Sequence, residues 1–309
     1  MRIDSTSVAL TACKQYTPEA LASSFEQVLG AVDDLPVLHS CHVLLKPNLI
    51  SAKFGTLPCT EPAFMLAAAR WFIDQGALVS IGDSPAFGTA EEALTKLGVA
   101  GQLQALGVEI NNFSKIRNVP LACGATAGIA AAAMDCDLLV NLPRVKAHGQ
   151  ARVTLAVKNC FGCLAGLRKP LWHMAYGGKN GSFCSRLVQI LDVLADSLTL
   201  VDGITAMHKT GPLHGKPYPL GVIAASTNPV AVDRALVDIL KLSPDQSPLL
   251  AACQAKNIPG SHLQEIHFPL LQPQELRVTD FSIPGELAPI RFSLVRFVTN
   301  MIRRALRAV

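Results

Sequence analysis

The chain has few charged and few aromatic residues. Of its 309 residues, 16% are charged and 6% are aromatic, whereas 50% are hydrophobic. No apolar run is long enough to cross a bilayer, because the best one, LACGATAGIAAAAM at 121–134, is short and is followed by Asp135 and Asp137. We therefore expect a buried element there, in a chain long enough for one large core or two modest ones.

Several functional signatures are also missing. The opening MRIDSTSVAL has no apolar core behind its arginine, so we expect a cytoplasmic protein without a secretory signal. Zinc-finger, helix-turn-helix and RNA-binding patterns are absent, and we expect no nucleic-acid partner. The net charge of +4 becomes −1 once the five arginines of the last nineteen residues are set aside. No dinucleotide-binding glycine motif, Walker motif or G-x-S-x-G elbow occurs either.

The order of apolar and polar segments predicts the fold. Short apolar runs alternate with capped helical patterns, as in βαβ units. We expect an α/β fold over residues 1–285, with a mostly parallel sheet and helices on both faces in Rossmann-like layers, as one domain or as two lobes around a cleft. The expected strands are 7–12, 42–46, 77–83, 137–142, 198–204 and 220–226, and the expected helices are 18–32, 61–76, 89–98, 182–195 and 230–242.

Polar residues gather just after the expected strands, where ligands bind in open α/β sheets. The segments are KPN at 46–48, GDSP at 82–85, NLPRVKAH at 141–148, DGITAMHKTGP at 202–212 and STNPVAVD at 226–233. Together with TLAVKNCFG at 154–162 and the pair Trp172 and His173, they resemble the domain of unknown function 362 family. The resemblance implies an α/β fold and a map of motifs, and some members carry an appended ferredoxin-like segment whose cysteine run is absent here.

Two features depart from the pattern that the resemblance implies. Members of that family generally have apolar residues at the positions of Cys160 and Cys163, so these thiols are not expected to be the shared chemistry. A glutamate is also common in the family where His208 and Lys209 stand in this chain. An acid role at that position is therefore not expected.

Cations in the matched segments predict an anion site. Lysine and arginine side chains at strand ends bind carboxylate or phosphate groups. The candidate cations are Lys46, Arg144, Lys146, Lys158 and Arg168, and the expected ligand-binding residues are Lys46, Asn48, Lys146, Lys158, Asn159 and Asp233. A small anionic molecule is the expected partner.

Histidines and aspartates of the same segments are candidates for acid–base chemistry. His148 and His173 could transfer protons because imidazole titrates near neutral pH. Asp83 and Asp202 could orient a ligand or bind a metal. The glycine-rich stretch 203–215 is expected to be a tight loop that could hold a phosphate through its backbone amides. An enzyme similar to the lactate racemases is a further alternative, without a diagnostic motif.

Nine cysteines leave open a second hypothesis, a redox protein that binds an iron–sulfur cluster or a divalent metal such as zinc. Cys160, Cys163 and Cys184, with His173, have a spacing that could hold such a group. However, the run before Cys160 and the glycines after it suggest that the C-x-x-C pair closes a helix, the end that does not stabilise thiolates. Buried structural thiols are the other interpretation.

The last residues form a separate element. We expect a basic amphipathic helix at 286–309, because Leu294, Val298 and Met301 share one face opposite Arg296 and Arg303. Such a helix docks on the body of the protein, or it binds a membrane surface or a protein partner through residues 288–309.

Overall fold

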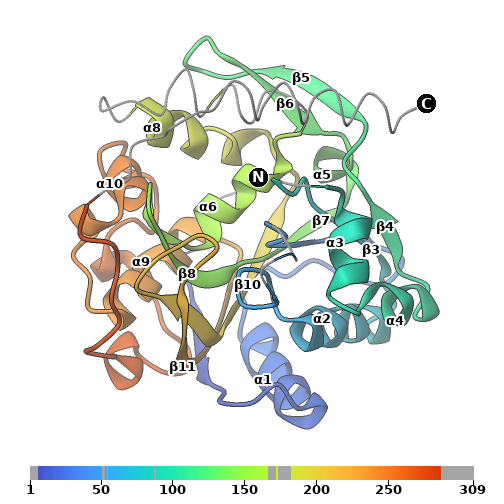
Figure 1. Cartoon of the computed structure of the whole chain (residues 1–309), viewed down its shortest axis with the longest axis horizontal. Helices are drawn as coiled ribbons and strands as arrows, with labels where there is room; N and C mark the ends of the chain where they lie inside the picture. The colour runs from blue at the N-terminus through green and yellow to red at the C-terminus, as the bar shows by residue number, and fades with distance from the viewer. Residues whose placement is uncertain are drawn as a thin grey trace.

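Nine strands form one sheet in the computed structural model, which describes residues 6–50, 53, 55–86, 88–165, 172 and 182–286 (Figure 1). The strand order is β1-β11-β10-β7-β2-β3-β4, and β8 pairs with β10 and with β9. The strands are β1 (Ala9–Ala12), β2 (His42–Pro47), β3 (Leu78–Gly82), β4 (Glu109–Asn111), β7 (Leu138–Leu142), β8 (Arg144–His148), β9 (Arg152–Thr154), β10 (Ser197–His208) and β11 (Lys216–Ser226).

Most of this sheet is parallel. The run from β10 through β7, β2 and β3 to β4 pairs in parallel, as does β8 with β10. The pairs β1–β11, β10–β11 and β8–β9 are antiparallel. The predicted α/β fold with a mostly parallel sheet is thereby confirmed.

Helices cover both faces of the sheet. One face carries α1 (Pro18–Gly30), α2 (Pro62–Asp74), α3 (Ala90–Lys96) and α4 (Ala100–Ala105). The other carries α5 (Ala132–Asp135), α6 (Ala156–Cys160), α8 (Ser182–Val188), α9 (Pro229–Ile239) and α10 (Pro248–Gln254). Short 3-10 segments occur at Phe161–Cys163, Leu191–Val193, Pro244–Gln246, Leu263–Glu265 and Pro273–Leu276. None of the helices among the described residues is long and apolar enough to span a membrane.

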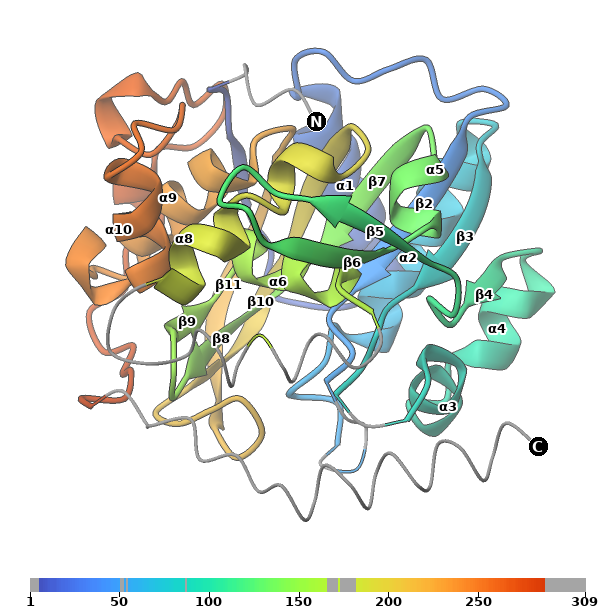
Figure 2. The same cartoon turned by 90° about the horizontal axis from the view of Figure 1, so that it is seen from above.

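Alternation along the strands separates the two cores. In β2, Leu44 joins the core that packs under α6 and α9, whereas Val43 and Leu45 join the core under α1 and α2. A separate hairpin of β5 (Ile116–Pro120) and β6 (Thr126–Ala130) lies over the α6 side, as Figure 2 shows. The sheet is therefore buried on both faces, as expected when helices connect parallel strands.

Helix starts follow the predicted caps. Thr17 precedes Pro18, and its side chain accepts from the Ala20 amide at 3.3 Å. Thr89 accepts from the Glu92 amide at 3.1 Å. These bonds satisfy amides that have no partner inside the helix.

Two expected loops are strands instead. Residues 144–148 form β8, and β10 continues beyond the expected strand 198–204 to His208, so Asp202 lies inside a strand and not at its end. The reason is tertiary, because β8 finds backbone partners on both sides, in β9 and β10. Residues 121–134, expected as one buried element, contain β6 and α5. The expected helix at 286–309 lies outside the described residues, apart from Glu286.

Candidate functional site

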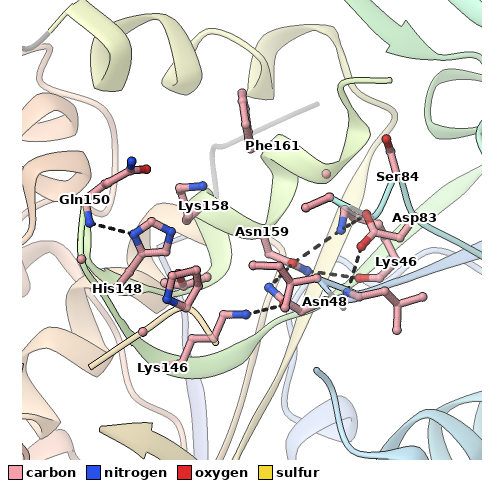
Figure 3. A pocket seen from close by; sticks show the side chains of 18 residues that line it. Lys46, Asn48, Asp83, Ser84, Lys146, His148, Gln150, Lys158, Asn159 and Phe161 are labelled. Carbon is pink, nitrogen blue, oxygen red and sulfur yellow. Dashed lines mark hydrogen bonds and ion pairs between the residues drawn. The ribbon is translucent and has the colours of Figure 1, made fainter. Parts of the chain in front are cut away.

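A cavity of about 360 Å³ lies beyond the carboxyl ends of β2 and β3 and beside β8 (Figure 3). It occupies the place where the strand order diverges, because β3 lies on one side of β2 and β7 on the other. Open α/β sheets bind ligands at such switch points. The predicted site residues that line the cavity are Lys46, Asn48, Asp83, Lys146, His148, Lys158 and Asn159.

Lys46 and Asp83 form a buried ion pair at one side of this cavity. The Lys46 Nζ lies 2.9 Å from Asp83 Oδ1, and Lys46 is 0% exposed. The second carboxylate oxygen accepts from the Leu49 amide at 2.9 Å. A β-carbon at Gly162 would overlap both Lys46 and Asp83, so only glycine lets the backbone after α6 lie on the pair. The two charges largely offset one another.

A buried amide network joins this pair to the middle of the cavity. Asn159 Nδ2 donates to Asn141 Oδ1 at 2.8 Å and to the Lys46 carbonyl at 3.3 Å. Asn159 Oδ1 accepts from Asn48 Nδ2 at 2.9 Å. The amide of Asn159 is thus engaged within the protein, and it fixes α6 against β2 and β7.

Lys146 lies on the other side of the network, on β8. Its Nζ donates to Asn48 Oδ1 and to the Pro58 carbonyl, both at 2.7 Å, and the residue is 1% exposed. Both partners are uncharged. Burial lowers the pKa of Lys146 to about 7, and the nearby cations Lys158 and Arg144 act in the same direction. Lys146 is therefore an amine that changes protonation state near neutral pH.

His148, at the end of β8, has a defined tautomer. Its Nδ1 accepts from the amides of Gln150 at 3.0 Å and Ala151 at 3.2 Å. An acceptor at Nδ1 places the ring proton on Nε2. His148 is therefore a hydrogen-bond donor through Nε2, and protonating Nδ1 would remove the acceptor that both amides need.

Lys158 belongs to α6, and Asp233 contacts the start of this helix from α9. The half-buried Lys158 ammonium is 4.8 Å from the centre of the Phe161 ring. The Asp233 carboxylate accepts from the Ala156 amide at 2.7 Å and so caps α6. Burial raises the pKa of Asp233 to about 8, against the effect of its amide hydrogen bonds. Asp233 is not among the residues that line the cavity.

Asp202 belongs to a different cluster. Its Oδ2 lies 2.8 Å from Arg144 Nη1 and accepts from the Glu61 amide at 2.9 Å. Its Oδ1 accepts from the Tyr16 hydroxyl at 2.7 Å. Both Arg144 and Asp202 are buried outside the cavity lining. The structure therefore separates Asp202 from Asp83 and His148.

Cys160 and Cys163 lie in the apolar core, and the half-buried Cys184 packs against it. Cys160 ends α6 and Cys163 follows it, as the sequence predicts, and both are buried. Burial raises the pKa of Cys160, with a smaller effect from Cys163, and burial also raises the pKa of Cys184. In the described part of the chain, no group of three or more His, Cys, Asp or Glu side chains could hold a metal ion. His173 and Arg168 lie outside that part.

Sequence reasoning missed Thr154 and expected Gly211 in a tight loop. Thr154 on β9 pairs with Lys146 in register and lines the cavity, and its buried hydroxyl has no hydrogen-bond partner among the described residues. Gly211 lies in the turn between β10 and β11, where a β-carbon would overlap the Ala147 carbonyl. An alternating pattern across 144–154 was the available signal for β8 and β9.

Known proteins match most of the length of this chain. Residues 43–238 match the family described as Domain of unknown function (DUF362). Thylakoid-associated protein sll1697 of Synechocystis sp. is 34% identical over 301 residues, which cover 96% of this chain and 94% of that protein.

Two solved structures are more distant. The lactate racemase apoprotein from Thermoanaerobacterium thermosaccharolyticum is 14% identical with a TM-score of 0.41, over 65% of this chain and 51% of that one. A protein from Thermotoga maritima is 12% identical with a TM-score of 0.36, over 67% of this chain and 56% of that one. The chain thus spans only about half the length of either structure. Because the family match covers most of the strands that build the cavity, and the relative matches nearly end to end, this chain belongs to the domain of unknown function 362 family.

Proposed function

We propose that the cavity binds a small anion with a carboxylate or phosphate group, and that Lys146 exchanges a proton with it. The observation that supports this is the charge of the lining. Among the described lining residues, three lysines face one carboxylate, and that carboxylate pairs with Lys46. Lys158, and Lys146 when it is protonated, thus give the cavity a positive potential in a partly dry site, where fixed charges bind anions most strongly.

The acid–base part of the proposal rests on Lys146. A pKa of about 7 leaves both the ammonium and the neutral amine populated near neutral pH. His148 contributes a hydrogen bond from Nε2 to a ligand oxygen, and Asn48 holds the amine in place at 2.7 Å. In this proposal Asp83 orients Lys46, and Asp202 has no part in proton transfer.

Ligand titration of point variants tests the anion site. Inorganic phosphate and propionate are titrated into the wild-type chain by calorimetry, and the shift in melting temperature is recorded in parallel. We expect Lys158→Met and Lys146→Met to weaken binding of at least one anion by tenfold or more, the equivalent of about 1.4 kcal/mol. Lys96→Met, at the end of α3 and away from the cavity, is the matched control. Unchanged affinity in both cavity variants would overturn the proposal.

A second candidate function is membrane association through residues 286–309. The specific observation is the name of the Synechocystis relative, which describes it as thylakoid-associated. A basic amphipathic helix binds anionic lipid surfaces by apolar burial and charge attraction. Full-length protein should float with anionic vesicles and less with neutral ones, and the triple change Arg303→Glu, Arg304→Glu and Arg307→Glu should abolish flotation. Equal flotation of the triple variant would exclude the helix as the anchor.

A further inference from the structure

We propose that Lys146 forms an imine with a small α-oxo acid, a ligand that carries a carbonyl beside a carboxylate. The inference rests on the proposed anion site and names its ligand class. It stands on the contacts of one amine, on the residues that surround it and on an unpartnered hydroxyl in the same lining.

The contacts of Lys146 match a neutral amine. A neutral amine has two N–H donors and one lone pair, whereas an ammonium has three donors. Lys146 Nζ has two acceptors at 2.7 Å, Asn48 Oδ1 and the Pro58 carbonyl, and no ion pair to a carboxylate among the described residues. Two donors and two acceptors leave the lone pair for a third direction. Figure 3 shows the amine beside Asn48, in a cavity that the same lysine lines.

Lys46 is a buried lysine of the same cavity whose contacts differ from those of Lys146. Its ammonium has a carboxylate at 2.9 Å and a carbonyl at 2.9 Å, so its charge is compensated. Lys46 and Lys146 are equally buried but have opposite surroundings. A lysine that is buried without a counter-charge is one that the protein keeps available as a nucleophile.

Thr154 supplies a second, independent observation. Its hydroxyl is buried in the cavity lining without a partner in the described part of the protein, and the residue lies opposite Lys146 in the β8–β9 register. Buried polar groups are nearly always hydrogen-bonded, so the Thr154 hydroxyl has its hydrogen-bonding capacity open to an atom in the cavity, from a water or from a ligand. The carbonyl oxygen of a ligand whose carbon is bonded to the Lys146 amine would be a hydrogen-bond partner for this hydroxyl.

The chemistry balances without a further reagent. The Lys146 lone pair attacks the carbonyl carbon, a C–N bond forms, and the carbonyl electron pair moves to oxygen, which takes a proton. The nitrogen then loses a proton, which gives a neutral carbinolamine. Its hydroxyl takes up a second proton and leaves as water when the C–O bond breaks, and the nitrogen loses its remaining proton, so that one carbonyl and one amine give one imine and one water. The Nε2–H of His148 and the Thr154 hydroxyl can donate hydrogen bonds to the departing oxygen.

Lys158 is the cation that would meet the carboxylate of the ligand. Lys158 lines the same cavity from α6, and its charge acts on Lys146. A carboxylate next to the carbonyl would place its charge beside Lys158 while the carbonyl meets Lys146. Phosphate or a simple carboxylate would use only the first of these interactions.

Reductive trapping on the full-length protein tests the inference. Pyruvate is added with cyanoborohydride, which reduces an imine to a stable secondary amine, and the modified peptide is identified by mass spectrometry. We expect one adduct per chain on Lys146, with a mass gain equal to pyruvic acid less one oxygen atom. Lys158→Met should raise the pyruvate concentration needed for half-maximal labelling by tenfold or more, and Lys96→Met should leave it unchanged.

Propionate separates the failure of this inference from the failure of the anion site. It has the carboxylate but no carbonyl, so it should bind, block trapping competitively and leave no adduct. Propionate binding without any pyruvate adduct on Lys146 would overturn the inference and leave the anion site standing. Absence of both binding and trapping would overturn both proposals. Site mapping on the wild-type chain keeps the result independent of whether Lys146→Met folds, and pyruvate spread over surface lysines at equal rates would also overturn the inference.

Discussion

The amine of Lys146 and the side-chain oxygen of Asn48 are 2.7 Å apart, and the oxygen is uncharged. Because this partner carries no charge, it does not offset the effect of burial, which lowers the pKa of Lys146 to about 7. It also joins Lys146 to the amide network that runs through Asn159 to Lys46. The state of the reactive amine is therefore set by a side chain on another strand end.

Asn48→Asp should raise the pKa of Lys146 because a carboxylate favours the charged amine. The pH dependence of labelling of Lys146 by an amine-selective reagent, read by mass spectrometry, measures this pKa directly. We expect the midpoint to move up by one pH unit or more, and pyruvate trapping at neutral pH to fall about tenfold. Asn118→Asp on the exposed strand β5 adds the same charge elsewhere and should leave the midpoint in place.

Stability should rise with pH through the titration of Lys146. The ordinary pKa is 10.5 and the folded value is about 7, so between these pH values the unfolded chain binds the extra proton. The free energy of unfolding then increases with pH by at most about 1.4 kcal/mol per unit. Burial, Lys158 and Arg144 cause the shift, whereas Cys59 and Asp83 oppose it.

Urea unfolding at several pH values isolates this contribution. The free-energy difference between wild type and Lys146→Met should change steadily in favour of the wild type from pH 7 upward. The exposed-site change Lys96→Met should give a constant difference. If the free energies of unfolding of wild type and Lys146→Met change in parallel with pH, the Lys146 amine binds the same number of protons in the folded and the unfolded chain over this range.

Gly162→Ala should disrupt the ion pair of Lys46 and Asp83, because a β-carbon would overlap both side chains. We expect a loss of about 1–3 kcal/mol in the free energy of unfolding and weaker phosphate binding. Gly101→Ala is the matched control, since a β-carbon there meets nothing within 4 Å and the residue lies in α4. That change should stabilise the protein by up to about 1 kcal/mol. Equal effects of the two changes would contradict the close packing at Gly162.

Asp202→Asn should destabilise the fold without changing the cavity. Removing one charge leaves Arg144 buried without its nearest partner, at a cost of about 3–5 kcal/mol. Affinity for phosphate should stay within twofold of the wild type, because Asp202 does not line the cavity. The exposed pair of Arg117 and Asp135 provides the comparison, and Arg117→Ala should cost at most about 1 kcal/mol. A large loss of affinity in Asp202→Asn would return this residue to the site.

Replacing Cys160 and Cys163 together by alanine should leave metal content and phosphate affinity unchanged. Both thiols are buried in the core, so the expected effect is a loss of about 1–2 kcal/mol from the two small cavities. Protein purified without oxygen is compared with the double variant by plasma mass spectrometry and visible absorption. Iron or zinc that is present in the wild type and lost in the variant would make these cysteines ligands.

Most strands of the sheet could be predicted from the sequence, but the strand β8, which carries Lys146 and His148, could not. Capped helices such as α1 and α3 and apolar strands such as β2 follow local rules, so their bounds were predictable to within a few residues. The strand β8 was not, because its polar residues Lys146 and His148 look like a loop until β9 and β10 pair with it. The alternating pattern across 144–154 was the local signal for these strands, and pairing with β9 and β10 decided the segment.

The sequence was enough to predict which residues form the candidate site, but it did not predict the role of each residue. Strand-end reasoning brought Lys46, Asn48 and Lys146 to one cavity, as the structure has them. Which lysine has a counter-charge depends on contacts between distant segments, such as Lys46 with Asp83. The same holds for the His148 tautomer, which is set by two amides in the next turn.

The pairing of β1 with β11 has a consequence for how the chain is made. Ala9 pairs with Ala225, so the first strand has to wait for synthesis of most of the chain before its partner exists. Until then the residues of β1 are an apolar segment without a sheet, the kind of segment that chaperones bind on the ribosome. The edge of the sheet at β11 is in turn open until β1 docks, and open edges pair with other chains. Docking of β1 therefore follows synthesis of β11, and it replaces part of the edge of β11, which has 11 residues, by the shorter edge of β1, which has 4 residues.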